Sequence, residues 1–359
     1  MITRLTEYLL ISLVLSLGFG QLLRFSMPFG TLYLHDVLVL VALVLNFRSW
    51  IGIVERRSWI GTILILVGLA TGWVSALLHY PITHLLLPLM YTLRLLAYLS
   101  LYLVLRQSKT KISVSYFFLG VMIQWLIGIF QYFSLPDMRW AQYLGWDDHL
   151  SRLTLPHFDP TFSGIMLALG GLLAIDFKKY WLAGLLAPAV LLTYARSVWL
   201  SLLLSLTPRL KFSGVLIAAI CLLLTAALLP KRFGEGTNLL RTFSITSRYQ
   251  SDLLLVKNLR WDLVTGVGLN TFALQSVSVK GYPNHAAGPN DSYLYILATS
   301  GILGVVGWGI FLRDFYKNSH HQTSILFVII ASLFNNVLFY PFVMLWLFLI
   351  ETVTDSRSR

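Results

Sequence analysis

The residues best suited to chemistry gather in one loop between apolar stretches, at residues 230–290. Seven basic and three acidic residues give this loop a net charge of +4. The basic residues are Lys231, Arg232, Arg241, Arg248, Lys257, Arg260 and Lys280. Arginine is suited to anions that accept two parallel hydrogen bonds, and a lipid-linked diphosphate at a membrane surface is one such partner. Charge alone also fits a solvated loop that touches lipid headgroups, so both interpretations stay open.

The same loop combines helix and turn signals with polar side chains. The run from Arg248 to Trp261 predicts a helix, and Gly266-Val267-Gly268 follows it. Two glycines around a valine allow a tight turn, which brings the backbone close to a ligand or simply ends the helix. At the start of the next apolar segment, Asp291 or Ser292 predicts an N-cap. An N-cap role does not exclude a catalytic one.

Two more candidates belong to apolar segments. Arg94 lies near the centre of segment 85–105, where a charged residue is a functional candidate by default, although pairing with Asp36 or contact with interior carbonyls is an equal alternative. Asp159-Pro160 opens segment 160–176 and predicts an N-cap followed by a helix-starting proline.

The composition predicts that a bundle of membrane-spanning helices positions these residues. Residues of the set AVILMFWYC make up 57% of the 359 residues and charged residues only 12%, whereas soluble domains average about 25% charged. The formal charge of +12 does not indicate nucleic acid, because the lysines and arginines fall mostly in short runs between apolar segments. We interpret residues 1–359 as a single polytopic, all-α integral membrane domain.

Twelve apolar segments are predicted, and two pairs of them could instead form single long helices at 180–207 and 323–352. The segments are 8–23, 32–47, 59–79, 85–105, 112–134, 160–176, 180–194, 197–207, 212–229, 292–312, 323–335 and 341–352.

Charge favours twelve membrane spans over ten. With twelve spans and a cytoplasmic N-terminus, every short basic loop lies inside, as the positive-inside rule requires. With ten spans, four basic residues move outside: Arg209, Lys211, Arg313 and Lys317. Arg196 then lies near mid-bilayer, which costs roughly 2.5–3.5 kcal/mol on insertion. Twelve spans leave two large outer loops, about 135–159 and 230–290, where we expect the chemistry.

From Arg248 through Gly266-Val267-Gly268 to Asn290-Asp291-Ser292 and Gly301-Ile302-Leu303-Gly304, the chain resembles the bacterial O-antigen ligase and polymerase superfamily. The family pattern has an arginine about 18 residues before a GxG, then a His-Asn pair, then a glycine eleven residues after the histidine. A second family arginine, at an outer hairpin, is matched by Arg196-Ser197. The resemblance covers residues 190–350 best and implies a GT-C type glycosyltransferase.

One departure concerns the family histidine, because its place is taken by Asn290, which cannot act as a general base. The next residue, Asp291, looks more like the polymerase side of the superfamily. His285 could supply an imidazole if the loop folds back. The resemblance implies attack of a sugar hydroxyl on the anomeric carbon of a glycan linked to undecaprenyl diphosphate. Arg196 and Arg248 would stabilise the leaving diphosphate and Asp291 or His285 would receive the acceptor proton.

We therefore predict a polymerase of undecaprenyl-diphosphate-linked repeat units, working on the outer face of the bacterial cytoplasmic membrane. It would need no metal or cofactor, and its partners would be a glycan donor, a glycan acceptor, the bilayer and a chain-length regulator. The alternatives are an O-antigen ligase that acts on a lipid A core and, from another class, a polysaccharide flippase. The predicted substrate-binding residues are Asn290, Arg94, Arg241, Arg260 and Asp159.

Overall fold

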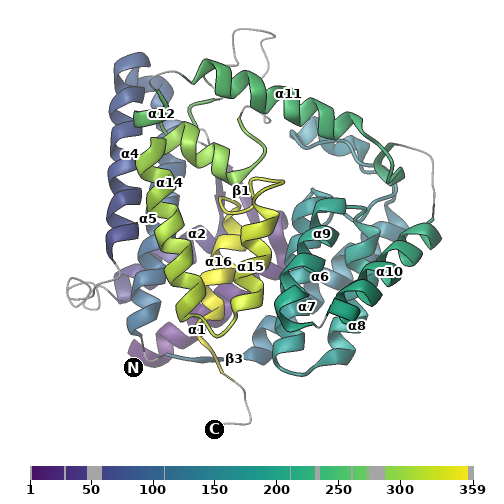
Figure 1. Ribbon diagram of the computed structural model, residues 1–359. Coiled ribbons are helices and arrows are strands. Elements are labelled where there is room, and N and C mark those ends of the chain that lie inside the picture. Colours follow the sequence, from purple (N-terminus) through teal and green to yellow (C-terminus); the bar gives the residue numbers. More distant parts are fainter. Residues whose placement is uncertain are drawn as a thin grey trace.

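A computed structural model describes residues 2–27, 30–46, 59–108, 110–210, 212–230, 235–259, 262–272, 274 and 288–354. Each of the twelve predicted apolar segments contains a helix (Figure 1). These helices are α1 (Ile2–Phe19), α2 (Leu34–Leu45), α4 (Trp59–His79), α5 (Leu86–Gln107), α6 (Val114–Ser134), α7 (Pro160–Asp176), α8 (Tyr180–Leu192), α9 (Arg196–Leu206), α10 (Phe212–Leu228), α14 (Ser292–Asn318), α15 (Gln322–Ala331) and α16 (Pro341–Ile350).

The remaining elements of the described residues are short, except for one helix in the second predicted loop. That helix is α11 (Phe243–Asn258), and α12 (Asp262–Thr265) follows it. Strands pair antiparallel as β1 (Arg24–Met27) with β2 (Gly30–Tyr33), and parallel as β3 (Ile112–Ser113) with β4 (Val353–Thr354). The 3-10 helices are Gly20–Leu23, Ile82–Leu85, Arg139–Leu144, Thr207–Arg209 and Glu235–Thr237.

The prediction that a helix starts at Arg248 is wrong, because α11 begins five residues earlier at Phe243. Residues 243–247 are mostly polar, which hid them from an apolar pattern. They contain no glycine or proline, so nothing in them prevents the helix from starting earlier.

Length and apolarity make several of these helices suited to a membrane. Among the described residues, five helical stretches are long and apolar enough to cross one: Arg4–Leu23, Trp59–His79, Ile82–Gln107, Val114–Ser134 and Ser292–Asn318. Shorter apolar helices of 10–17 residues accompany them. The fold is thus all-α, with apolar helices that indicate membrane association.

Both doubtful pairs of segments are separate helices. The stretch 180–207 breaks after Leu192, and Arg196 is the first residue of α9 instead of lying inside a long helix. The stretch 323–352 breaks between Ala331 and Pro341, with Asn335 and Asn336 in the connection. Both breaks place polar side chains at helix ends, and these ends meet at the candidate site described below.

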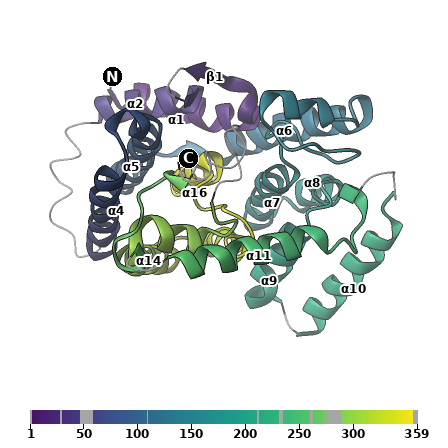
Figure 2. The same cartoon turned by 90° about the horizontal axis from the view of Figure 1, so that it is seen from above.

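The helices form two groups around a central one. Helix α16 is buried over most of its length and appears near the middle of the end-on view (Figure 2). Helices α4, α5 and α14 lie on one side of it and α6 to α10 on the other. Helix α11 crosses one end of the bundle, passing between α14 and α9, while the β3–β4 pair lies at the opposite end (Figures 1 and 2).

Close packing of α4 against α14 holds the start of α14 in place. A Cβ on Gly68 of α4 would lie 2.7 Å from the backbone nitrogen of Gly304 and from the oxygen of Ser300, so only a glycine allows the two backbones to approach this closely. Gly301 interrupts α14 with a φ of 63° and packs against Val264, at α12. This contact places α12 against α14.

The Gly266-Val267-Gly268 turn lies at the same contact between α12 and α14. Gly266 has a φ of +76° and no room for a Cβ against the Thr299 oxygen. The Val267 nitrogen donates a hydrogen bond to Ala298 O at 2.9 Å, and the Gly268 nitrogen donates one to Thr299 O at 3.1 Å. The turn therefore follows α12, not the long helix, and its close contacts are with the bundle.

Candidate functional site

One cavity of about 590 Å³ brings together most of the predicted site residues. It is lined by residues of α11 and of the starts of α7, α9 and α14. We call it the arginine cavity, after the four arginines in its wall. Its charged and polar lining residues are Asp147, His149, Arg152, Asp159, Thr161, Arg196, Ser197, Arg241, Arg248, Tyr249, Asp252, Asn290 and Asp291.

Arg248 is held by the connection between α15 and α16. Its Nη1 donates to Phe334 O at 3.0 Å and to Asn335 Oδ1 at 2.9 Å. Asn335 Nδ2 in turn donates to Ser197 Oγ at 3.0 Å. This chain links α11, the break before α16 and the start of α9, so the two helix breaks orient the guanidinium.

The other three arginines are also oriented by backbone carbonyls. Arg196 Nη1 donates to Leu239 O at 2.8 Å. Arg241 Nη1 donates to Gly236 O at 2.6 Å. Arg152 is buried, and its Nε donates to Thr193 O at 2.9 Å. Carbonyl partners orient a guanidinium without neutralising its charge.

Charge at Arg152 is costly in this environment. Its pKa is lowered to about 9, first by burial and then by the charge of Arg241. Arg196 and Arg248 contribute to this fall, and Asp159 opposes it. At neutral pH the side chain is still charged, so its charged form reduces stability there. Within the described part of the chain, no carboxylate lies at ion-pair distance from Arg152, Arg196 or Arg248. An anion in the cavity would relieve this cost.

Two of the cavity's carboxylates cap helices. Asp159 Oδ1 accepts from Thr161 N at 2.6 Å and from Phe162 N at 2.9 Å, ahead of Pro160, as predicted. Asp291 Oδ1 accepts from Leu294 N at 2.7 Å. The predicted N-caps are therefore confirmed, and both residues also line the arginine cavity.

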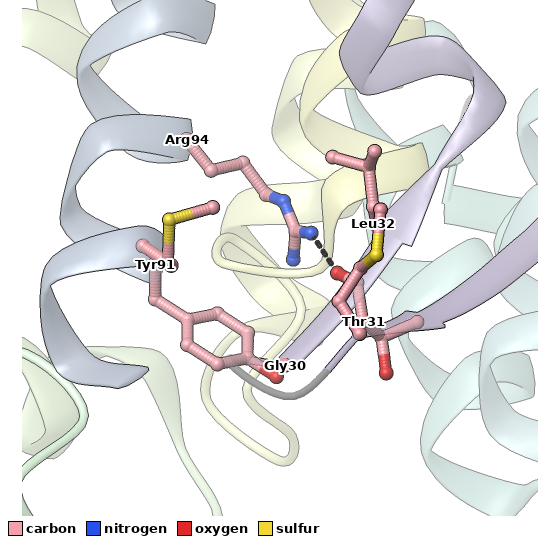
Figure 3. Close-up of a pocket in the computed structure, with 7 residues that line it drawn as sticks. Gly30, Thr31, Leu32, Tyr91 and Arg94 are labelled. Atoms are coloured by element: carbon pink, nitrogen blue, oxygen red, sulfur yellow. Dashed lines mark hydrogen bonds between the residues drawn. The ribbon is translucent and has the colours of Figure 1, made fainter. Parts of the chain in front are cut away.

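Not every predicted site residue lies in this cavity. Arg94 lines a separate cavity of about 270 Å³ together with Met27, Thr31 and Tyr91 (Figure 3). Its Nε and Nη2 donate to the Asp36 carboxylate at 3.0 and 2.8 Å, and Nη2 also donates to Thr31 O. The alternative of pairing with Asp36 is confirmed, and Arg94 is placed apart from the four arginines.

Two predicted residues, His285 and Arg260, lie outside the described residues. Conversely, Arg152, His149 and Asp252 line the arginine cavity but were not predicted as site residues. One signal for Asp252 was present: a spacing of four from Arg248 on a predicted helix puts both side chains on one face.

Comparison of the sequence with protein-family models and with curated proteins finds no match. Function must therefore be argued from the cavity itself. Arginines held by backbone carbonyls, together with carboxylates in the same cavity, can bind an anionic leaving group and a neutral hydroxyl nucleophile side by side.

Proposed function

We propose that the protein is a GT-C type membrane glycosyltransferase that polymerises undecaprenyl-diphosphate-linked repeat units. The observation that carries the proposal is that Arg152, Arg196, Arg241 and Arg248 line one cavity with Asp252 and Asp291. The arginines would bind the diphosphate and stabilise the charge that grows on it as the glycosidic oxygen departs. A carboxylate would receive the proton of the attacking sugar hydroxyl.

The positions of the arginines outside the interior of the apolar helices favour an enzyme over a transporter. Arg152 and Arg241 lie between helices, Arg196 is the first residue of α9, and Arg248 belongs to α11. A polysaccharide flippase would need basic groups along a path inside the helices. Arg94, in the interior of α5, is instead paired with Asp36.

A ligase remains the second candidate within the same chemistry. Both reactions displace undecaprenyl diphosphate, and they differ in the acceptor, which is a growing glycan for the polymerase and a lipid A core for the ligase. Asn290 at the place of the ligase histidine favours the polymerase. The expected partners are thus the lipid-linked donor, a glycan acceptor, the bilayer and a chain-length regulator.

Binding of inorganic diphosphate tests the arginine cavity without any sugar. We expect diphosphate to raise the unfolding temperature of the purified protein more than sulfate does at equal ionic strength, because it neutralises Arg152 and its neighbours. The Arg248→Ala variant should lose most of this shift. Arg139→Ala is the control, since Arg139 is exposed and pairs with Asp137 outside the cavity. Equal shifts for diphosphate in both variants would contradict the proposed anion site.

Topology is tested by cysteine labelling in a Cys221→Ser background. We propose twelve spans, with α11 outside the cytoplasmic membrane and the C-terminal end of α14 in the cytoplasm. Lys257 near the end of α11 and Lys317 near the end of α14 are both exposed. Cysteine at Lys257 should react with an impermeant maleimide in intact cells, and cysteine at Lys317 only after permeabilisation. Labelling of both from one side would exclude this topology.

A further inference from the structure

Asp252 is an acidic residue in the wall of the arginine cavity, and part of its carboxylate is buried. Asp252 lines the cavity one helical turn after Arg248 on α11. Its Oδ1 is buried and accepts no hydrogen bond from the described residues. In the middle of a helix this carboxylate is not needed as a cap, so the sequence position gives it no structural task.

The other acceptors in the cavity are less suited to take up a proton. Asp159 and Asp291 already accept backbone N–H groups as the N-caps of α7 and α14, so their carboxylates are engaged in structural hydrogen bonds. His149 has its pKa lowered to about 4, first by burial and then by Arg152, which makes it a weak base. Asp147 is exposed to solvent, and the Asn290 amide is not a base.

The surroundings of Asp252 act in the opposite direction from those of His149, because they favour the protonated form. Its pKa is raised, first by burial and then by the nearby Asp291 carboxylate. The Asn290 backbone hydrogen bond and the Arg248 charge oppose this rise. A general base is more effective when its proton affinity approaches the working pH, so Asp252 is better matched to proton transfer than its neighbours.

We propose that Asp252 is the catalytic base, which takes the proton from the acceptor sugar hydroxyl. The assignment rests on the glycosyl transfer proposed above. The hydroxyl oxygen forms a bond to the anomeric carbon, and its proton moves to the Asp252 carboxylate. The bond between the anomeric carbon and the diphosphate oxygen breaks, and its electron pair leaves with undecaprenyl diphosphate, whose charge the arginines stabilise.

The test compares three Asp→Asn variants of the full-length protein in liposomes. The donor is undecaprenyl-diphosphate-linked repeat unit isolated from source cells that lack this protein, and both polymer and released undecaprenyl diphosphate are measured. Asp252→Asn should lower kcat about 10²–10⁴-fold while diphosphate binding, followed by the thermal shift, stays unchanged. Asp262→Asn, in the same loop but outside the cavity, should transfer at the parent rate.

The pH profile separates a base from a merely structural residue. The parent rate should rise with pH as Asp252 loses its proton, and then level off. In Asp291→Asn this rise should move to lower pH, because removal of the neighbouring negative charge lowers the pKa of Asp252, and asparagine still caps α14.

Three outcomes overturn the assignment. Parent-level kcat in Asp252→Asn overturns it while the proposed function stands. A pH profile that does not move in Asp291→Asn also removes Asp252 as the titrating group. No release of undecaprenyl diphosphate by the parent protein overturns the proposed function and the assignment together.

Discussion

Replacement of Arg248 by alanine should lower the rate of polymer formation by about 10²–10³, the usual loss for one electrostatic donor to a developing negative charge. Arg196→Ala should have a similar effect, since both guanidinium groups line the arginine cavity. Lysine at position 248 should restore little. A point charge cannot contact Phe334 O and Asn335 Oδ1 and still present a planar fork to a diphosphate.

The measurement is polymer formed per inserted protein, with membrane insertion and unfolding temperature measured for each variant. Arg139→Ala serves again as the control, because it removes an arginine whose exposed ion pair contributes little. Near-parental polymer from Arg248→Ala or Arg196→Ala would remove that residue from the mechanism.

The second large effect concerns the α4–α14 contact. Gly68→Ala should lower the unfolding temperature strongly and reduce polymer formation with it, because the new Cβ would meet backbone atoms of Ser300 and Gly304 at 2.7 Å. Backbone cannot move away as a flexible side chain can, so the helices must separate, at a cost of about 1–3 kcal/mol or more. The start of α14, which carries Asp291, would shift with them.

Gly309→Ala is the matched control in the same helix, where an added Cβ meets nothing within 4 Å. Its unfolding temperature should stay the same or rise, since alanine favours a helix over glycine by roughly 0.5–1 kcal/mol. Equal thermal stability of Gly68→Ala and Gly309→Ala would show that the glycine contact does not hold the two helices together.

Much of the helix pattern could be predicted from the sequence, because long apolar runs separated by charged residues leave few alternatives. The breaks before Arg196 and around Asn335 followed from the positive-inside rule for the basic loops and from the cost of burying Arg196 in a membrane. Capping residues such as Asp159 and Asp291 were equally predictable, since an N-cap is a local feature of a few residues.

The composition of the site was less predictable, because it depends on contacts between distant segments. Arg152 belongs to the first predicted loop and reaches the arginines of the second loop only through the packing of α7 and α9. Asp252 stood among the charges of a basic loop, and no pattern showed that one of its oxygens is buried. For Arg94, the sequence allowed a functional role and a structural role equally. Only the structure shows that the Asp36 carboxylate lies beside it.

Transfer by the purified protein tests the central claim most directly. The protein is reconstituted in liposomes with undecaprenyl-diphosphate-linked repeat units, and released undecaprenyl diphosphate is measured together with glycan length. We predict that the parent releases undecaprenyl diphosphate as glycans lengthen. In Arg248→Ala, both the release and the lengthening should be much slower. Movement of the intact lipid-linked unit across the membrane without release of undecaprenyl diphosphate would contradict the account and identify a transporter instead.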